Sequence, residues 1–86
     1  MKHTKQVNDY PGSHEELAES LGDLYYDALA EFLRQLSNKM AKDGDADDRR
    51  ERPRLAAELH SCSQHLREAA EHIDAAWEIC KPYVEE

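Results

Sequence analysis

Residues 53–80 read PRLAAELHSCSQHLREAAEHIDAAWEIC, and this stretch decides the fold. Its apolar residues recur at alternating spacings of four and three, the unbroken heptad pattern of a helix that packs against another helix. Pro53 suits the first turn of such a helix, and Pro82 ends it because the ring cannot continue the hydrogen-bond ladder. We therefore predict a helix over residues 53–80. The heptad positions are Leu55, Leu59, Cys62, Leu66, Ala69, Ile73, Ala76 and Cys80.

A second long helix is predicted over residues 14–42. Ser13 and Glu16 have the spacing of a capping box, in which each side chain accepts a hydrogen bond from the other residue's backbone N–H. The apolar residues that follow cover about half of the helix circumference, which is more than one neighbouring helix can cover. Gly22 inside this range indicates either a close helix approach or a tolerated glycine. The apolar residues are Leu17, Leu21, Leu24, Tyr25, Ala28, Leu29, Phe32, Leu33, Leu36 and Met40.

The rest of the chain is predicted to be an arm and a loop. Residues 1–12 form a short N-terminal arm, and the polar residues 43–52 (DGDADDRRER) form the inter-helix loop, with Gly44 ending the first helix. Residues 13–86 are then one all-α domain, an antiparallel two-helix hairpin. A lone hairpin buries little apolar surface, so we expect a homodimer in which two hairpins form a four-helix bundle. The expected interface residues are Tyr25, Leu29, Phe32, Leu33 and Leu36.

Charge and cysteine content narrow the setting in which the protein works. The net charge of -8 disfavours binding to nucleic acid or to anionic membranes, and no apolar run reaches the roughly 18–20 residues of a membrane span. Cys62 and Cys80 lie about 27 Å apart along one helix, too far for a disulfide. Both are expected to be reduced and at least partly buried, which places the protein in the cytoplasm.

Three groups of residues raise the question of metal binding. Asp43, Asp45 and Asp47 resemble the start of an EF-hand calcium loop, but the later positions of that loop hold Asp48 and Arg54 instead of glycine and glutamate. Along the second helix, Glu58, His65 and His72 are spaced by seven residues, or about 10.5 Å, so one chain cannot hold one ion with both histidines. Cys62 and His65 are one turn apart. We predict no cofactor, and leave open a metal at His65, at His72 or in the segment from Asp43 to Asp48.

A short motif carries a family resemblance. Ser20-Leu21-Gly22-Asp23-Leu24, preceded by Glu16 and Glu19, resembles part of the helical nucleotide pyrophosphohydrolases of the MazG type. The resemblance implies magnesium-dependent nucleotide hydrolysis, with Glu16, Glu19 and Asp23 as the ligands. Ser20 stands where that family has a glutamate, and the arm has no room for the family's upstream carboxylate-bearing helix.

No nucleophile with an activating base can be assembled from sequence spacing alone, so we assign no catalytic residue. The expected function is therefore a small acidic helical dimer that acts as a protein–protein interaction or regulatory module. Two alternatives remain: a MazG-type magnesium-dependent enzyme, and an acidic inhibitor or nucleic-acid mimic, which the net charge permits.

Overall fold

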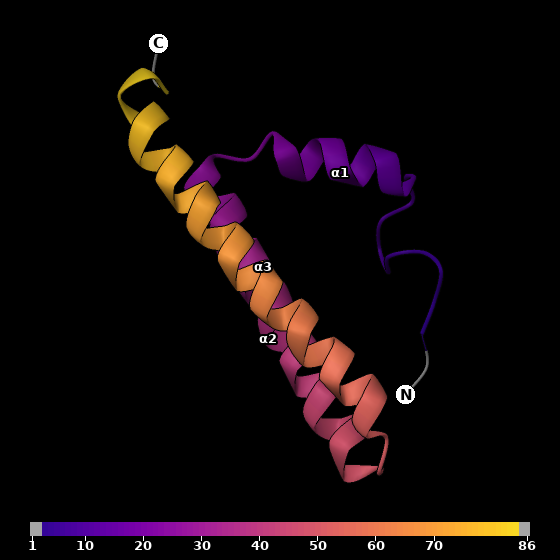
Figure 1. The fold of residues 1–86 in the computed structure, drawn as a ribbon. Coiled ribbons are helices and arrows are strands. Elements are labelled where there is room, and N and C mark those ends of the chain that lie inside the picture. The colour runs from indigo at the N-terminus through magenta and orange to yellow at the C-terminus, as the bar shows by residue number, and fades with distance from the viewer. Residues whose placement is uncertain (1–2, 85–86) are drawn as a thin grey trace.

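The computed structural model describes residues 3–84, and these residues form an all-α protein without strands. The elements are α1 (His14–Gly22), α2 (Tyr26–Arg49), α3 (Pro53–Cys80) and a short 3₁₀ turn, η1 (Lys81–Tyr83). Figure 1 shows α2 and α3 side by side as an antiparallel hairpin, with α1 leaving the hairpin at a wide angle. The range of α3 is the one that the heptad pattern predicts.

The predicted single helix over residues 14–42 is wrong, because α1 ends at Gly22 and α2 begins at Tyr26. The capping box is present: Glu16 N donates to Ser13 Oγ at 3.1 Å, and Ser13 N donates to Glu16 Oε1 at 2.9 Å. A glycine has low helix propensity, and a Cβ built on Gly22 would meet no atom within 4 Å, so Gly22 marks a break and not a close helix approach. At the break Tyr25 has extended backbone angles, and its ring stacks on Trp77 with centroids 5.9 Å apart.

The predicted loop over residues 43–52 is also wrong, because α2 continues to Arg49 and only residues 50–52 connect it to α3. Gly44 lies inside α2, and Glu51 takes the left-handed conformation at the helix end, with a φ of 58°. Arg52 N donates to Asp47 O at 2.9 Å, which closes the end as a Schellman motif. A motif that usually carries glycine carries glutamate here, and this is why the sequence pattern located the end too early.

Small side chains fill the contact between α2 and α3. At its centre, Ser37 Oγ donates to Ser63 O at 2.9 Å, and Ser63 Oγ donates to Ser37 O at 2.8 Å. Side chains this small let the two backbones approach closely, and a Cβ on Gly44 would lie 2.8 Å from Nε2 of His60. We call this buried row the seam. It recurs every seven residues and consists of Ala30, Ser37 and Gly44 on α2 and Ala56, Ser63 and Ala70 on α3.

The seam divides the hairpin into two faces. A helix turns by about 100° per residue, so positions three and four residues after a seam residue lie on opposite sides of the seam. One side is the apolar face, which also includes the positions one residue before each seam residue; the other is the polar face. The apolar face contains Leu29, Leu33, Leu36, Met40, Leu55, Leu59, Cys62, Leu66 and Ile73. The polar face contains Arg34, Asn38, Asp45, Asp48, His60, Arg67 and Asp74.

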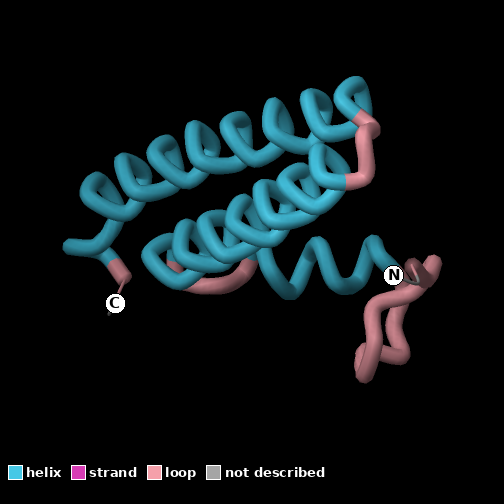
Figure 2. Tube along the Cα trace, turned by 90° about the horizontal axis from the view of Figure 1, so that it is seen from below, coloured by secondary structure: helices cyan, strands magenta, loops and turns pink. Residues whose placement is uncertain are grey.

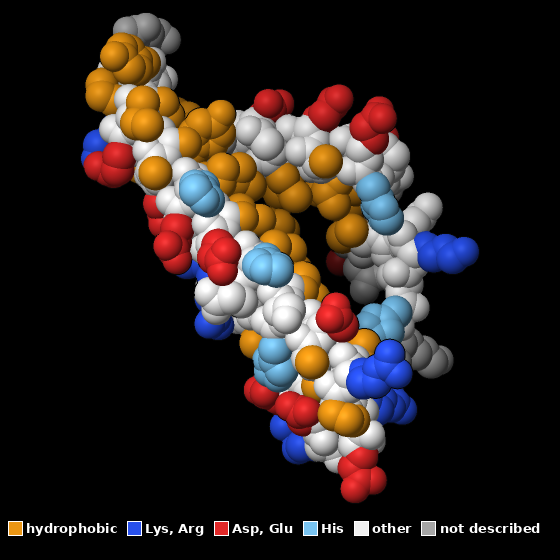
Figure 3. Space-filling model, in the orientation of Figure 1, with side chains coloured by type: hydrophobic (Ala, Val, Ile, Leu, Met, Phe, Trp, Pro, Cys, Tyr) orange, Lys and Arg blue, Asp and Glu red, His pale blue; other side chains and the backbone are white. Residues whose placement is uncertain are grey.

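The chain is far more extended than a compact domain of its size. Its radius of gyration is 15.5 Å, whereas 86 residues in a compact domain give about 12 Å. The molecule measures 52 × 29 × 14 Å, because the hairpin is long and α1 stands apart from it instead of packing against it (Figures 1 and 2). Figure 3 shows hydrophobic side chains on the side of α1 that faces the hairpin and along the facing edge of the hairpin, with open space between them.

Candidate functional site

The apolar face is only partly covered. Among residues 3–84, the hydrophobic residues that are buried are all alanines, Ala30, Ala56 and Ala70. The larger apolar side chains are half-buried or exposed, because the contact between the helices is already filled by the seam. Leu55 remains 46% exposed. Contiguous apolar surface of this kind marks a site of association in a folded protein.

The structure places the predicted interface residues along one helix. Leu29, Leu33 and Leu36 lie half-buried on the apolar face of α2. Phe32, 41% exposed, lies farther round the same helix, and Tyr25, 61% exposed, precedes it. Leu59, Leu66 and Ile73 of α3 lie on the same face, and the sequence prediction did not include them. Seven-residue spacing of small residues on both helices was the signal that would have located it.

Aromatic side chains gather at the end of the hairpin where α1 departs. The stacked rings of Tyr25 and Trp77 border a groove of about 440 Å³ that Tyr26 and Tyr83 also line. Tyr83 is 65% exposed. Tyrosine and tryptophan are the side chains that most often anchor protein interfaces, because they bury a large area with few rotatable bonds. This aromatic end therefore extends the apolar face.

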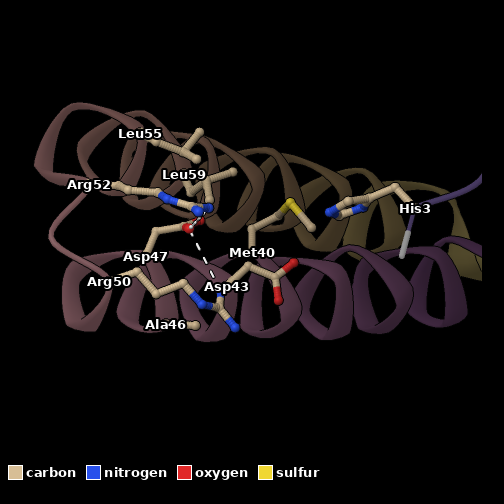
Figure 4. A pocket seen from close by; sticks show the side chains of 9 residues that line it. All are labelled: His3, Met40, Asp43, Ala46, Asp47, Arg50, Arg52, Leu55 and Leu59. Atoms are coloured by element: carbon tan, nitrogen blue, oxygen red, sulfur yellow. Dashed lines mark hydrogen bonds and ion pairs between the residues drawn. The ribbon is translucent and has the colours of Figure 1, made fainter. Parts of the chain in front are cut away.

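A second groove, of about 680 Å³, lies at the loop end of the hairpin (Figure 4). Met40, Leu55 and Leu59 of the apolar face line it. The buried Asp47 also lines it, and its Oδ1 lies 3.8 Å from Arg50 Nη1 and 3.5 Å from Arg52 Nη1. The two guanidinium groups compensate this carboxylate, so the end of the apolar face has a polar rim without an unpaired buried charge.

The polar face carries contacts that cross from α2 to α3. Arg34 Nη1 lies 2.8 Å from Asp74 Oδ2, and Arg67 Nη2 lies 3.5 Å from Asn38 Oδ1. Both contacts are exposed, so they add little to stability. They lie on the side of the seam opposite the apolar face.

Nearer the loop, the polar face brings together two carboxylates and an imidazole. His60 Nε2 lies 3.3 Å from Asp45 Oδ1 and 3.7 Å from Asp48 Oδ2. One ligand atom from each of the three residues lies within 4.8 Å of the other two. The sequence pattern did not predict this cluster, because the segment from Asp45 to Asp48 was expected to be a loop and lies in α2 instead. On a helix, residues three apart share a face.

The aspartates that resemble the start of an EF-hand calcium loop do not form such a loop, because they lie on a helix and pair with different residues. Asp43 Oδ1 pairs with Lys39 Nζ at 2.7 Å, Asp47 faces the two arginines and Asp45 faces His60. His65 and His72 are exposed on α3 and do not belong to the cluster.

The three acids of the MazG-like motif lie on or just after α1 and are exposed. Glu16 uses its carboxylate in the capping box, where the backbone N–H and then the hydroxyl of Ser13 lower the pKa of that carboxyl. Glu19 accepts a helical-end hydrogen bond from Asp23 N through its backbone carbonyl. Within the described residues, the three-residue group with metal-ligand spacing is the one on the polar face and not this one.

The cysteines are free, but their burial differs from the prediction. Cys80 is half-buried as expected, whereas Cys62 is exposed. The predicted burial of Cys62 is wrong because the buried row of α3 passes through Ser63, one residue later than the heptad positions.

These features define an all-α hairpin with a small-residue seam, one unpartnered apolar face and one polar face. No known protein family matches the chain, and neither a curated protein nor a solved structure that matches it was found. No helix within residues 3–84 is long and apolar enough to cross a membrane. Function is therefore inferred from the geometry of this chain alone.

Proposed function

We propose that the protein is a homodimeric helical module for protein–protein interaction or regulation, and that the apolar face is its self-association surface. One observation carries the proposal: the seam closes the hairpin with alanine, serine and glycine and leaves the leucines of both helices on one open face. A second hairpin related by a two-fold axis covers that face with an identical face, which is the simplest closed assembly. The product is an antiparallel four-helix bundle.

The accessible surface area of the chain is large enough to supply a homodimer interface. The chain exposes 6957 Å², whereas a folded monomer of 9.9 kDa exposes roughly 5,200 Å². The surplus is about 1,750 Å² per chain, or about 3,500 Å² for two chains. Obligate homodimers bury roughly 2,000–5,000 Å² in total.

Electrostatics are compatible with association through this face, although each chain has a net charge of -8. Asp43 and Asp47, the acids nearest to the apolar face at the loop end, both have cationic neighbours within 4.0 Å. The remaining repulsion between two acidic chains is screened by salt. We therefore expect the dimer to strengthen, and not weaken, as ionic strength rises.

The detached α1 fits the same arrangement. Its half-buried Leu17 and Leu21 belong to a helix whose apolar side faces the open space beside the hairpin (Figure 3). We place the second hairpin in that space, between α1 and the apolar face. The aromatic end then remains at the edge of the dimer as a surface for a protein partner, and the free thiols fit a cytoplasmic setting.

Sedimentation equilibrium of the wild-type chain and of Leu33→Asp tests the proposal. A fully buried leucine contributes about 1.5–3 kcal/mol, and a two-fold interface contains two copies. The variant should therefore weaken the dimer by up to about 10²–10⁴-fold, at 1.4 kcal/mol for each factor of ten. Leu33→Ala gives a graded loss in case the aspartate prevents folding.

Gln35→Asp is the matched control, because it introduces the same charge on the exposed side of the same helix. It should leave the dimer intact. A well-folded wild-type monomer at micromolar concentration would refute self-association and make a helix of another protein the better occupant of the apolar face. Equal effects of the two aspartate variants would show that charge alone, and not the apolar face, controls assembly.

A further inference from the structure

We propose that Asp45, Asp48 and His60 form a binding site for a divalent transition-metal ion of the Zn²⁺ type. The site joins the last turns of α2 to the first turns of α3 on the polar face. It lies on the side of the seam opposite the proposed dimer surface. Zinc binding can therefore be tested independently of the proposed function.

The distances within the cluster match those between ligands of one ion. Zinc–nitrogen and zinc–oxygen bonds of about 2.0–2.2 Å place neighbouring ligands of a tetrahedral site roughly 3.3–3.6 Å apart. The imidazole Nε2 of His60 lies 3.3 Å from Asp45 Oδ1 and 3.7 Å from Asp48 Oδ2. Both separations exceed the usual 2.7–3.2 Å of an N–H···O hydrogen bond. One ligand atom from each of the three residues lies within 4.8 Å of the other two.

The charges around Asp45 and Asp48 also favour a bound cation at this position. Four aspartates lie between residues 43 and 48, and two of them face lysine or arginine: Asp43 faces Lys39, and Asp47 faces arginines 50 and 52. Asp45 and Asp48 both lie beside His60, and an imidazole is neutral when it ligates a metal. These two carboxylates also lie in the last two turns of α2, where the helix dipole disfavours negative charge. A divalent cation compensates both effects.

Gly44 makes the geometry accessible. The His60 ring lies against the surface of α2 at this residue, and a Cβ there would stand 2.8 Å from Nε2 and 3.0 Å from Cδ2 and Cε1. Any larger side chain must displace the ring from its position beside Asp45 and Asp48. A glycine inside a helix costs about 1 kcal/mol relative to alanine, so its presence here matches a need for close approach.

The donor set selects the kind of ion. One imidazole nitrogen and two carboxylate oxygens suit Zn²⁺ and similar borderline ions, whereas Ca²⁺ and Mg²⁺ take oxygen ligands. All three side chains are partly exposed, so water can complete the coordination. The ion would fasten the two helices at the loop end of the hairpin.

Isothermal titration calorimetry of the untagged full chain with ZnCl₂ in a non-chelating buffer tests the site. The wild-type chain should bind one ion, and His60→Gln and Asp48→Asn should each lower the affinity at least about tenfold, a typical loss for a disturbed metal site. Gly44→Ala should give a similar loss by displacing the ring, while its far-UV circular dichroism shows that the helices persist.

His65→Gln is the matched control, because His65 is exposed on the same helix and lies one turn from Cys62. It should retain the wild-type affinity. The proposal is overturned if the wild-type chain binds no zinc, if His60→Gln binds as tightly as the wild type, or if His65→Gln loses as much affinity as His60→Gln. The last result would assign the zinc to the thiol of Cys62 and its neighbours.

Discussion

Replacing Ser37 probes the seam directly, since its side chain is completely buried and faces Ser63 across the two helices. Each serine hydroxyl donates one hydrogen bond to the other residue's carbonyl oxygen, at 2.9 and 2.8 Å. Ser37→Ala removes one of these two bonds, which costs about 0.5–1.5 kcal/mol. Alanine has a higher helix propensity than serine, and this offsets part of the loss.

Ser37→Leu has a larger effect, because it inserts a branched side chain where the Oγ atoms of the two serines are 3.0 Å apart. Overpacking costs about 1–3 kcal/mol. Separation of the helices also breaks both serine bonds, which adds about 1–3 kcal/mol. The expected loss is therefore about 2–6 kcal/mol, a large part of the stability of a domain this small.

Urea unfolding followed by far-UV circular dichroism gives the free energy of unfolding by linear extrapolation. All variants are compared at one protein concentration, because the proposed dimerisation would make the apparent stability concentration-dependent. Ser61→Ala and Ser61→Leu are the matched controls, since Ser61 is exposed on α3 and its substitutions change helix propensity without touching the seam. If Ser37→Leu unfolds at the same urea concentration as Ser61→Leu, the close small-residue contact between α2 and α3 is refuted.

Two further predictions concern the start of α1 and the thiols. The pKa of Glu16 is lowered by its hydrogen bonds with Ser13, so the capping contribution is fully present above the ordinary carboxyl pKa and is lost as the pH falls through the lower folded-state value. The Ser13 amide signal in an NMR pH titration should follow that change in the wild type and lose it in Glu16→Gln; a wild-type signal that is insensitive to pH in this range contradicts the assignment. Cys62 should react with a thiol reagent faster than Cys80 in dilute solution, because it is the more exposed of the two. Its labelling should slow as the protein concentration rises and the apolar face is covered, and a rate independent of concentration argues against the dimer.

Local capping and periodicity signals in the sequence located the start of α1 and both ends of α3. The capping box set the start of α1 at His14, and the heptads with Pro53 set the range of α3. Both depend on interactions between residues close in the chain, so they can be recognised before the fold is known. The all-α class followed from the same signals.

Local capping and periodicity signals did not locate the ends of α2 correctly. The break before Tyr26 follows Gly22, whose low helix propensity is a local signal, but the stack of Tyr25 on Trp77 at the break joins residues that are neighbours only because the hairpin folds back. The helix end at Arg49 depends on a left-handed Glu51, which no sequence rule for glycine identifies. Tertiary contacts and an atypical cap therefore overrode the pattern at both ends.

The amino-acid sequence determined which side chains are available to the apolar face and to the cluster of Asp45, Asp48 and His60. They are the leucines that recur along two helices, and the aspartates that precede a histidine-bearing helix. Only the tertiary structure decided how these residues meet. The register fixed by Ser37 and Ser63 places His60 over Gly44, beside Asp45. The physical reason is that small side chains hold the backbones close in this register, so the seam takes up the contact between the helices and leaves the larger apolar side chains only partly covered.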